Sequence, residues 1–562
     1  MSREPGPSVV EALRLAQRGD AAAALEASSA LVRAHPADAR AHLAQGIALR
    51  MLGRIPEARA ALERAVGLAP GDYAAVFELG VALELAGDAR GALARFEQAM
   101  ALRPAFLPAR FAAARGLAMQ GRFPDALATI EPAVLADPRD PFALHEKGWV
   151  LHRSGRPDLA LPLLEAAAAA NPRNGAWRLD AAKAIADAGD AAGAREAYES
   201  AVRAAPSDVP TLLACARFHV SHGDFEAAAR HFAAALALAP GDPALPIYLA
   251  QAELVQRHWD PGWRAYALRE PRRGFEAARA SRGLAYRVPS LAEVAGREVT
   301  LVGEQGLGDV LFYLRFAPQL ARAGATLDFA GEARLLPLLA RTGIFRALRE
   351  GGTATQADSP LPVLVADLPS VPGVSPVPPP LPIAPDPARL ASWRAVLEAA
   401  GPRPWIGIAW RAGTPSDVLA HGLFKTLPLE ALCAAVRPLG GTVLAIQRHP
   451  AAGEVDRAGA ALGRPVHDLT RMNDDLDDAL AVVALLDRHI GVSNTNMHLA
   501  AAAGARADVL VPFPPEWRWT AQGDSPWFPG FGVHRQAIGG DWSAALAALS
   551  TAPTAGRPRA SR

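Results

Sequence analysis

The sequence predicts an all-helical repeat array followed by an α/β region built from parallel sheets. Two observations lead to this prediction. In the first half of the 562-residue chain, prolines, glycines and alanines recur every 34 residues. From about residue 297 onward, short β-branched runs alternate with amphipathic helical stretches, which is typical of parallel sheets covered by helices on both faces.

Four positions define the 34-residue period through seven successive units. Prolines stand at 36, 70, 104, 138, 172, 206 and 240, glycines at 19, 53, 87, 121, 155, 189 and 223, and alanines at 24, 58, 92, 126, 160, 194 and 228. Only Gly or Ala occurs at 46, 80, 114, 148, 182, 216 and 250. This pattern is the signature of tetratricopeptide repeats, in which each unit is an antiparallel helix pair.

Each repeated residue type has a physical reason. The glycine belongs in the turn between two helices, where a positive φ suits glycine alone. The proline separates one unit from the next, and the Gly or Ala position lets two helices approach closely. Because the units stack into one continuous core, we expect a docking surface for a protein.

The period decays after Pro240, and Arg257 stands where the next turn glycine is due. A terminal repeat is expected to be atypical because it caps the stack. We therefore predict a solenoid over residues 1–269, with about seven repeats and capping helices, and a connector over 270–296.

Composition narrows the classes of function. The chain carries 58 basic and 57 acidic residues, which argues against a general nucleic-acid surface. No signal-like start and no run of 18 apolar residues occurs, so we expect a cytoplasmic protein with no membrane span. Cys215 and Cys433 lie in apolar helical contexts and are interpreted as core residues, not as a disulfide or a metal site. The Pro/Ala/Arg-rich end, 551–562, is expected to be disordered.

Prolines divide the α/β region in two. Nine of them between 369 and 387 exclude a helix or a central strand there, so this stretch is interpreted as a linker. We predict two Rossmann-like halves, 297–385 and 386–550, facing each other across a cleft. Ligands of such sheets bind outside the carboxyl ends of the strands. Strands are predicted at 299–303, 325–330, 361–369, 405–410, 441–447, 465–469, 489–493 and 508–512.

The loops after these strands carry the candidate site residues. The segment from Gly303 to Asp309 reads GEQGLGD and leads into a helix. It is either a turn that binds a ligand or a tight turn in which Asp309 is the N-cap of the helix. Trp410 begins a loop that runs to Lys425, one of only three lysines in the chain. This lysine either contacts a phosphate group of a ligand or is a cation exposed to solvent. Gln447 ends the next strand, where it contacts a nucleobase or only solvent.

The loop after the strand at 489–493 is the most informative one. Ser493, Asn494, Thr495 and Asn496 close this strand, and His498 lies on the first turn of the helix that follows. Capping a helix needs one small polar residue. The surplus donors therefore indicate a ribose or phosphate site.

Two further segments are open to two interpretations each. The last predicted strand is followed by Glu516, Trp517 and Arg518. Aromatic rings beside an arginine either form the wall of an acceptor cleft or pack the two halves against each other. The acidic run 473–478 suits the first turn of a helix better than it suits a metal ion, so no metal site is expected.

These segments resemble a known enzyme group. GEQGLGD with LRFAP, the Trp410 loop, VSNTNMHLAAAAGA and VPFPPEWRW with DSPWFP look like segments of bacterial glycosyltransferases that combine tetratricopeptide repeats with a GT-B catalytic region. That group is related to heptosyltransferases and O-linked N-acetylglucosamine transferases. The S-N-T-N variant looks most like flagellin nonulosonic-acid transferases. The resemblance covers nearly the whole chain.

The resemblance also implies roles for individual residues. Asp309 matches the catalytic base, with Glu304 as the alternative, and Lys425 falls near a phosphate-contacting lysine. Ser493 stands where the group has an aspartate, which leaves the donor open. The residues assigned to donor binding, of which Gln447 is included because of its position at a strand end, are Gly308, Lys425, Gln447, Ser493, Asn494, Thr495 and His498. The residues assigned to the acceptor cleft are Trp410, Glu516, Trp517 and Arg518.

The resemblance thus implies a metal-independent protein O-glycosyltransferase without a cofactor. The repeats would capture a protein acceptor, flagellin by resemblance, and a Ser or Thr hydroxyl would attack the sugar of a nucleotide-sugar donor such as a CMP-activated nonulosonic acid. Two alternatives stay open. One is a transferase that uses UDP-N-acetylglucosamine or ADP-heptose, and the other is a scaffold whose GT-B region has lost catalysis.

Overall fold

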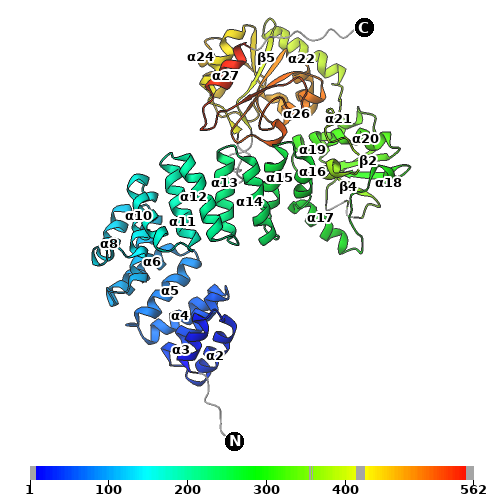
Figure 1. Cartoon of the computed structure of the whole chain (residues 1–562). Helices are drawn as coiled ribbons and strands as arrows, with labels where there is room; N and C mark the ends of the chain where they lie inside the picture. The colour runs from blue at the N-terminus through cyan, green and yellow to red at the C-terminus, as the bar shows by residue number, and fades with distance from the viewer. Residues whose placement is uncertain (1–7, 354–355, 357, 413–424, 552–562) are drawn as a thin grey trace. The chain divides into compact units, whose positions relative to one another are not determined.

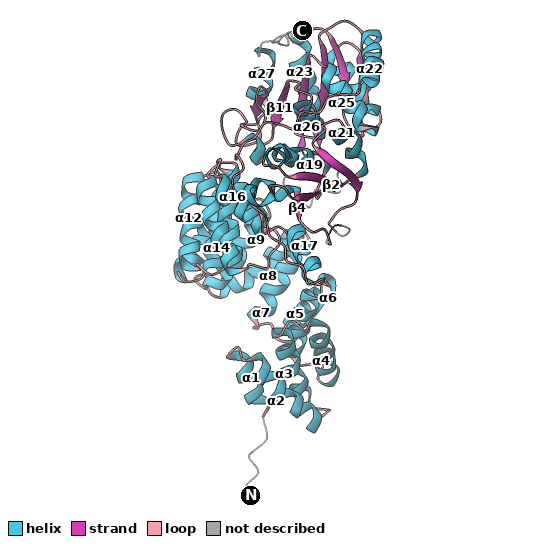
Figure 2. Ribbon diagram, turned by 90° about the vertical axis from the view of Figure 1, so that its right-hand side faces the viewer, coloured by secondary structure: helices cyan, strands magenta, loops and turns pink. Residues whose placement is uncertain are grey.

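The computed structural model describes residues 8–353, 356, 358–412 and 425–551. Residues 552–562 of the predicted disordered tail and part of the Trp410 loop lie outside these residues, whereas Thr551, the first residue of that tail, ends a helix. The chain divides into two compact units, residues 1–214 and 215–562 (Figure 1). The described part of the first unit is entirely helical, and the sheets belong to the second unit (Figure 2).

Antiparallel helix pairs build the first unit, and each pair corresponds to one 34-residue repeat. The predicted all-helical array is therefore confirmed. The helices are α1 (Val9–Gln17), α2 (Ala21–Ala34), α3 (Ala39–Met51), α4 (Ile55–Leu68), α5 (Tyr73–Leu85), α6 (Ala89–Leu102), α7 (Leu107–Met119), α8 (Phe123–Ala136), α9 (Pro141–Arg153), α10 (Pro157–Ala170), α11 (Gly175–Asp187) and α12 (Ala191–Ala204), and α13 (Val209–Ser221) contains the division between the units.

The turn glycines have the conformation that the repeat pattern predicts. All seven, from Gly19 to Gly223, have φ between 72° and 89°, a region that disfavours residues with a Cβ atom. The Gly or Ala position is a point of close helix approach. A Cβ atom on Gly80 would lie 2.6 Å from Cε1 of Phe96, and one on Gly46 would lie 2.4 Å from Cγ of Leu62.

The second unit begins with further helices of the same kind. Arg257 occupies the turn position between α15 and α16 with φ 68°, which is unusual for a residue other than glycine. Its guanidinium donates a 2.9 Å hydrogen bond to the carbonyl oxygen of Asp524, so it ties this turn to the loop that contains Asp524. These helices are α14 (Phe225–Leu238), α15 (Leu245–Leu254), α16 (Trp259–Tyr266), α17 (Glu270–Ala280) and α18 (Leu291–Val294).

Four parallel strands form the first sheet, in the order β3-β2-β1-β4. The helix that the sequence predicts after GEQGLGD is interrupted by a 3-10 turn at Leu314–Phe316 just before Pro318, whose ring suits only the first turn of a helix. The sequence prediction missed β3. The elements are β1 (Glu298–Val302), β2 (Thr326–Gly331), β3 (Phe345–Glu350), β4 (Pro362–Leu364), α19 (Leu307–Tyr313), α20 (Ala317–Arg322) and α21 (Leu336–Ala340).

Six parallel strands form the second sheet, in the order β12-β11-β10-β5-β8-β9. The strand order reverses between β5 and β10, and α/β sheets bind ligands at such a switch point. The strands are β5 (Trp405–Ala409), β8 (Thr442–Ala445), β9 (Val466–Asp468), β10 (Arg488–Val492), β11 (Ala507–Val511) and β12 (Gly532–Arg535).

The sequence prediction missed β12 and a short antiparallel pair, β6 (Arg411–Ala412) and β7 (Lys425–Thr426), which lies beside the switch point. The helices around the second sheet are α22 (Pro387–Ala400), α23 (Leu429–Val436), α24 (Glu454–Leu462), α25 (Leu476–Leu485), α26 (Thr495–Ala502) and α27 (Ser543–Thr551). The predicted fold class, a helical array followed by parallel α/β halves of the GT-B kind, is confirmed.

The proline-rich stretch between the sheets is packed against the second half. Leu381 and Ile383 are buried in the main core of the unit, and the amide of Ile383 donates a 2.9 Å hydrogen bond to the carbonyl of Ala502. Among the described residues, no helix has the length and apolar character that crossing a membrane requires.

Candidate functional site

Four alternating charges connect the two sheets at the carboxyl ends of their strands. Lys425 of β7 lies 2.5 Å from Oε2 of Glu516, and Arg518 pairs through separate nitrogens with Oε1 of Glu516 and with Oδ1 of Asp309. Asp309 belongs to the first turn of α19, which follows β1. We call Lys425, Glu516, Arg518 and Asp309 the ion ladder. It joins the loop that follows the first strand of one sheet to two loops of the other.

Burial and neighbouring opposite charges shift the pKa values of Glu516 and Arg518 in opposite directions, and the effect of the charges is the larger one. Burial alone would raise the pKa of Glu516, but Lys425 and Arg518 hold it far below its usual range. Burial alone would lower the pKa of Arg518, but Asp309 and Glu516 raise it further. Glu516 and Arg518 therefore stay ionised at neutral pH.

Aromatic rings support the central arginine of the ladder. The guanidinium of Arg518 lies 4.5 Å from the ring centroid of Trp517 and 4.8 Å from that of Phe312. The rings of Trp517, Phe312 and Trp527 also pack edge to face against one another. Flat, apolar surfaces of this kind stabilise a guanidinium and limit its motion. The central arginine of the ladder therefore packs against an aromatic cluster.

His498 lies beside the ladder in α26, and its side chain is almost fully buried. Burial, with the positive charge of Arg518 as a second cause, lowers the pKa of His498 well below its usual value, so the imidazole is neutral. Its Nδ1 atom has no hydrogen-bond partner among the described residues. A Cβ atom on Gly308 would lie 3.0 Å from Cδ2 of His498, so the glycine permits close approach of α19 and α26.

The small polar residues before His498 have different roles in the structure. The side chain of Asn494 caps α26 by accepting a hydrogen bond from the amide of Met497. The hydroxyl of Ser493 donates to Oε2 of Glu516 over 3.2 Å, and its carbonyl lies 3.4 Å from Nζ of Lys425. Thr495 is the first residue of α26. One residue therefore caps the helix, as expected, and Ser493 contacts the ladder.

Two other predicted residues serve the backbone near the switch point. The indole of Trp410 is buried in the core of the second half. The side-chain oxygen of Gln447 accepts hydrogen bonds from the amides of Trp410 (3.0 Å) and Arg411 (2.8 Å). In this arrangement Gln447 fixes the chain as it leaves β5, and Trp410 packs beneath it.

Glu304, the alternative base, lies in a different charged cluster. Its carboxylate pairs with Arg269, which also lies 2.7 Å from Asp367. Burial raises the pKa of Glu304, although Arg269 acts in the opposite direction. The Glu304 side chain is 3% exposed, whereas that of Asp309 is 34% exposed. Asp309 is therefore the more accessible of these two carboxylates.

Sequence reasoning did not single out Arg315 and Trp527, although both lie in quoted segments, LRFAP and DSPWFP. The guanidinium of Arg315 donates a 2.6 Å hydrogen bond to the carbonyl of Trp527 and lies 4.2 Å from the ring centroid of Phe312. Burial and the charge of Arg518 lower the pKa of Arg315 to about 9. The sequence feature that could have indicated a role for Arg315 is its position as a basic residue inside an apolar helical run.

Comparison with known proteins assigns the N-terminal part of the chain. Two tetratricopeptide-repeat family profiles match, one at residues 9–73, 52–105 and 145–209 and the other at 83–145. The N-terminal half is thus a tetratricopeptide-repeat array.

A curated protein of Caulobacter vibrioides (strain ATCC 19089 / CIP 103742 / CB 15), Protein FlbA, is 26% identical over 321 residues, which are 52% of this chain and 52% of that protein. The chain thus matches about half the length of this relative. A tetratricopeptide repeat protein from Parabacteroides merdae is 15% identical, with 43% of this chain and 95% of that chain covered and a TM-score of 0.38. A thermophilic one from Thermus thermophilus is 26% identical, with 32% and 99% covered and a TM-score of 0.29.

Proposed function

We propose that this chain is a protein O-glycosyltransferase that transfers a sugar from a nucleotide-sugar donor to a Ser or Thr of a protein held by the repeat array. One observation carries the proposal. The more exposed carboxylate of the ion ladder, Asp309, follows a strand of one sheet and pairs with Arg518, which follows a strand of the other, beside the small polar loop at the start of α26. The resemblance of the segments around these residues to GT-B transferases also supports a glycosyltransferase.

In the proposed reaction, the acceptor hydroxyl attacks the anomeric carbon of the donor sugar. A new C–O bond forms, the bond from the anomeric carbon to the donor phosphate breaks, and the hydroxyl proton passes to Asp309. Because Oδ1 of Asp309 pairs with Arg518, Oδ2 is the proposed proton acceptor. The pair with Arg518 also fixes the orientation of the carboxylate before the substrate arrives.

The departing nucleotide carries negative charge, and Lys425 is the proposed group that stabilises it. In this structure the ammonium of Lys425 is neutralised by Glu516. A donor phosphate would compete with Glu516 for that ammonium, while Arg518 keeps Glu516 paired. The amide groups at the start of α26 are a second source of positive potential.

The contact between Ser493 and Glu516 favours an active enzyme over a degenerate scaffold. Ser493 replaces the aspartate of the resembling transferases, but its hydroxyl donates to a carboxylate that a later loop supplies. A carboxylate is therefore present at this position of the site. Flagellin as the acceptor and a CMP-activated nonulosonic acid as the donor rest on the resemblance alone, and UDP- and ADP-sugars stay alternatives.

Donor binding tests this proposal first. We expect one of CMP-, UDP- and ADP-sugars to raise the melting temperature of the full chain, and we expect Lys425→Ala to abolish that shift. Lys183→Ala is the matched control, because this lysine pairs with Asp180 within the repeat array and should leave the shift unchanged. The absence of a shift with every donor, also when the acceptor protein is present, would contradict the proposal.

A further inference from the structure

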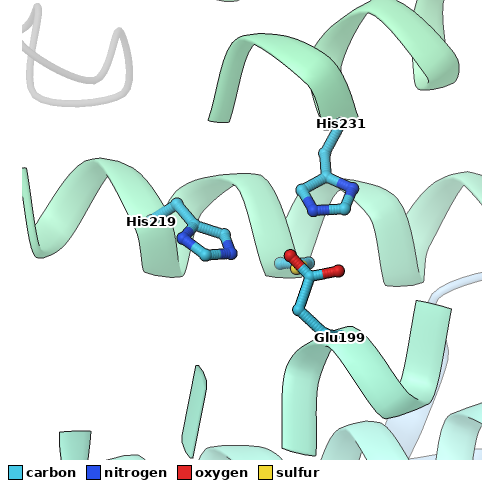
Figure 3. A group of neighbouring side chains, drawn as sticks. Glu199, His219 and His231 are labelled. Atoms are coloured by element: carbon cyan, nitrogen blue, oxygen red, sulfur yellow. The ribbon is translucent and has the colours of Figure 1, made fainter. Parts of the chain in front are cut away.

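A second group of polar side chains lies away from the ion ladder, in the last repeats. Cys215 and His219 are four residues apart and lie on one face of α13, and His231 lies in α14. Figure 3 shows the two histidines with Glu199 of α12. The ligand atoms of these four residues all lie within 4.8 Å of one another.

Both imidazoles are buried, and burial of a polar side chain is costly unless it has polar partners. Cys215 is fully buried, and His219 and His231 are 1% and 6% exposed. The surrounding helices are rich in alanine, and neighbouring repeats place small or apolar side chains in their cores. The concentration of a thiol, two imidazoles and a carboxylate at this one point is therefore not explained by the repeat pattern.

The orientation of His219 gives a second, independent observation. Nδ1 of His219 lies 3.3 Å from Oδ2 of Asp224, so Nε2 is the ring nitrogen that is directed to a ligand. A carboxylate that holds the other nitrogen of an imidazole is the usual outer partner of a metal-bound histidine. The ring centroids of His219 and His231 are 5.6 Å apart, and Figure 3 shows the two rings reaching the group from different helices.

We propose that Cys215, His219 and His231 bind a structural zinc ion, with Glu199 as the fourth ligand. Sulfur and imidazole nitrogen are the ligands that Zn²⁺ prefers, whereas Mg²⁺ and Ca²⁺ require oxygen. A thiolate and a carboxylate together neutralise the two positive charges of the ion. Binding releases the thiol proton of Cys215, so the affinity falls as the pH is lowered. This proposal replaces the interpretation of Cys215 as an ordinary core residue.

Four protein ligands would leave no open position for a substrate, so the ion has a structural role. It would fix the packing of α13 and α14 at the point where the regular repeats give way to the helices that precede the first sheet. Cys433 provides a contrast. Its side chain lies in the apolar core of the second half, and burial raises the pKa of its thiol to about 11, which disfavours the thiolate that a metal needs.

The test uses the full chain, purified without a histidine tag after growth with added zinc. We expect about one zinc ion per chain by elemental analysis. We also expect Co²⁺, added to the chelator-treated protein, to give a thiolate-to-cobalt charge-transfer band. Cys215→Ser should remove this band and lower the zinc content, whereas the matched control Cys433→Ser should change neither.

A further measurement keeps the proposal testable if Cys215→Ser does not fold. A strong chelator should lower the melting temperature of the wild-type chain, and added Zn²⁺ should restore it. Wild-type protein without bound zinc and without a response to chelator would overturn the proposal, because the group would then be a hydrogen-bonded polar cluster only. A charge-transfer band that persists in Cys215→Ser would also overturn it.

Discussion

The repeat array and the α/β region bury their charges in different ways. In the first unit, Arg115 pairs with Glu146, 31 residues away, and His145 pairs with Asp180, 35 residues away. These distances are close to one repeat. In the α/β region, Arg518 pairs with Asp309 across 209 residues, and Arg269 pairs with Asp367 across 98. An array is thus held by contacts between neighbours in sequence, whereas the candidate site depends on residues far apart in the chain.

The largest effect should follow from removal of the central arginine of the ladder. Arg518→Met removes the ion pair of Asp309 and one of the two positively charged partners of Glu516. Breaking a buried pair on one side costs about 3–5 kcal/mol, and we expect a loss of this size in the free energy of unfolding, measured in urea by tryptophan fluorescence.

Arg457→Met is the control for this variant. Arg457 pairs with Glu430 on the surface, so its removal should leave the unfolding midpoint unchanged. An Arg518→Met chain as stable as the control would show that the ladder is not a buried ionic connection, and the contrast between the two regions would lose its basis.

A smaller effect concerns pH. Burial lowers the pKa of His489, in β10, to about 4, although Asp508 acts in the opposite direction. The unfolded state takes up this proton near pH 6.5 and the folded state only near pH 4, so stability is complete above pH 6.5 and falls as the pH drops through this window. We expect His489→Leu to reduce the loss of stability between pH 7 and 5 by about 2 kcal/mol.

Urea unfolding at pH 7 and at pH 5, with wild type and variant compared at each pH, measures this difference. Equal losses for the two chains between these pH values would contradict the account of His489. A larger loss in the variant would mean that the histidine is protonated in the folded protein.

The smallest effects are expected within the array, where two glycines at helix centres have different surroundings. A Cβ atom on Gly80 would overlap Phe96, whereas one on Gly116 would lie 3.5 Å from Cδ1 of Leu93, an ordinary contact. Gly80→Ala should cost about 1 kcal/mol, because overpacking outweighs the gain in helix propensity. Gly116→Ala should gain about 0.5–1 kcal/mol from propensity alone. Thermal unfolding of the two variants compares them directly, and a gain for both would contradict close packing at position 80.

The same comparison explains how much could be predicted from the sequence. The turn glycines and the Gly or Ala positions predicted the array because each repeat contacts its neighbours through the same residues. Most strands were found because buried parallel strands are continuous apolar runs. β3 was missed because its sequence, FRALRE, is half exposed and carries three charges.

The candidate site was predicted only in part. Asp309, Lys425, Ser493 and His498 were recognised by their positions after strands or by resemblance, but sequence does not show which of them pair. The contact of Glu516 with both Lys425 and Ser493 depends on how three loops meet. Cys215 was interpreted as a core residue because its segment is apolar and helical, and the sequence does not show that the histidine of α14 lies near it.

The central proposal is that Asp309 accepts the proton of the acceptor hydroxyl. The most direct test is the rate of sugar transfer to the acceptor protein, followed by intact mass, with wild type, Asp309→Asn and the surface control Asp456→Asn. We expect Asp309→Asn to slow transfer by about 10²- to 10⁴-fold, with donor binding retained and the control unchanged. Transfer by Asp309→Asn at the wild-type rate would contradict the proposed role of Asp309.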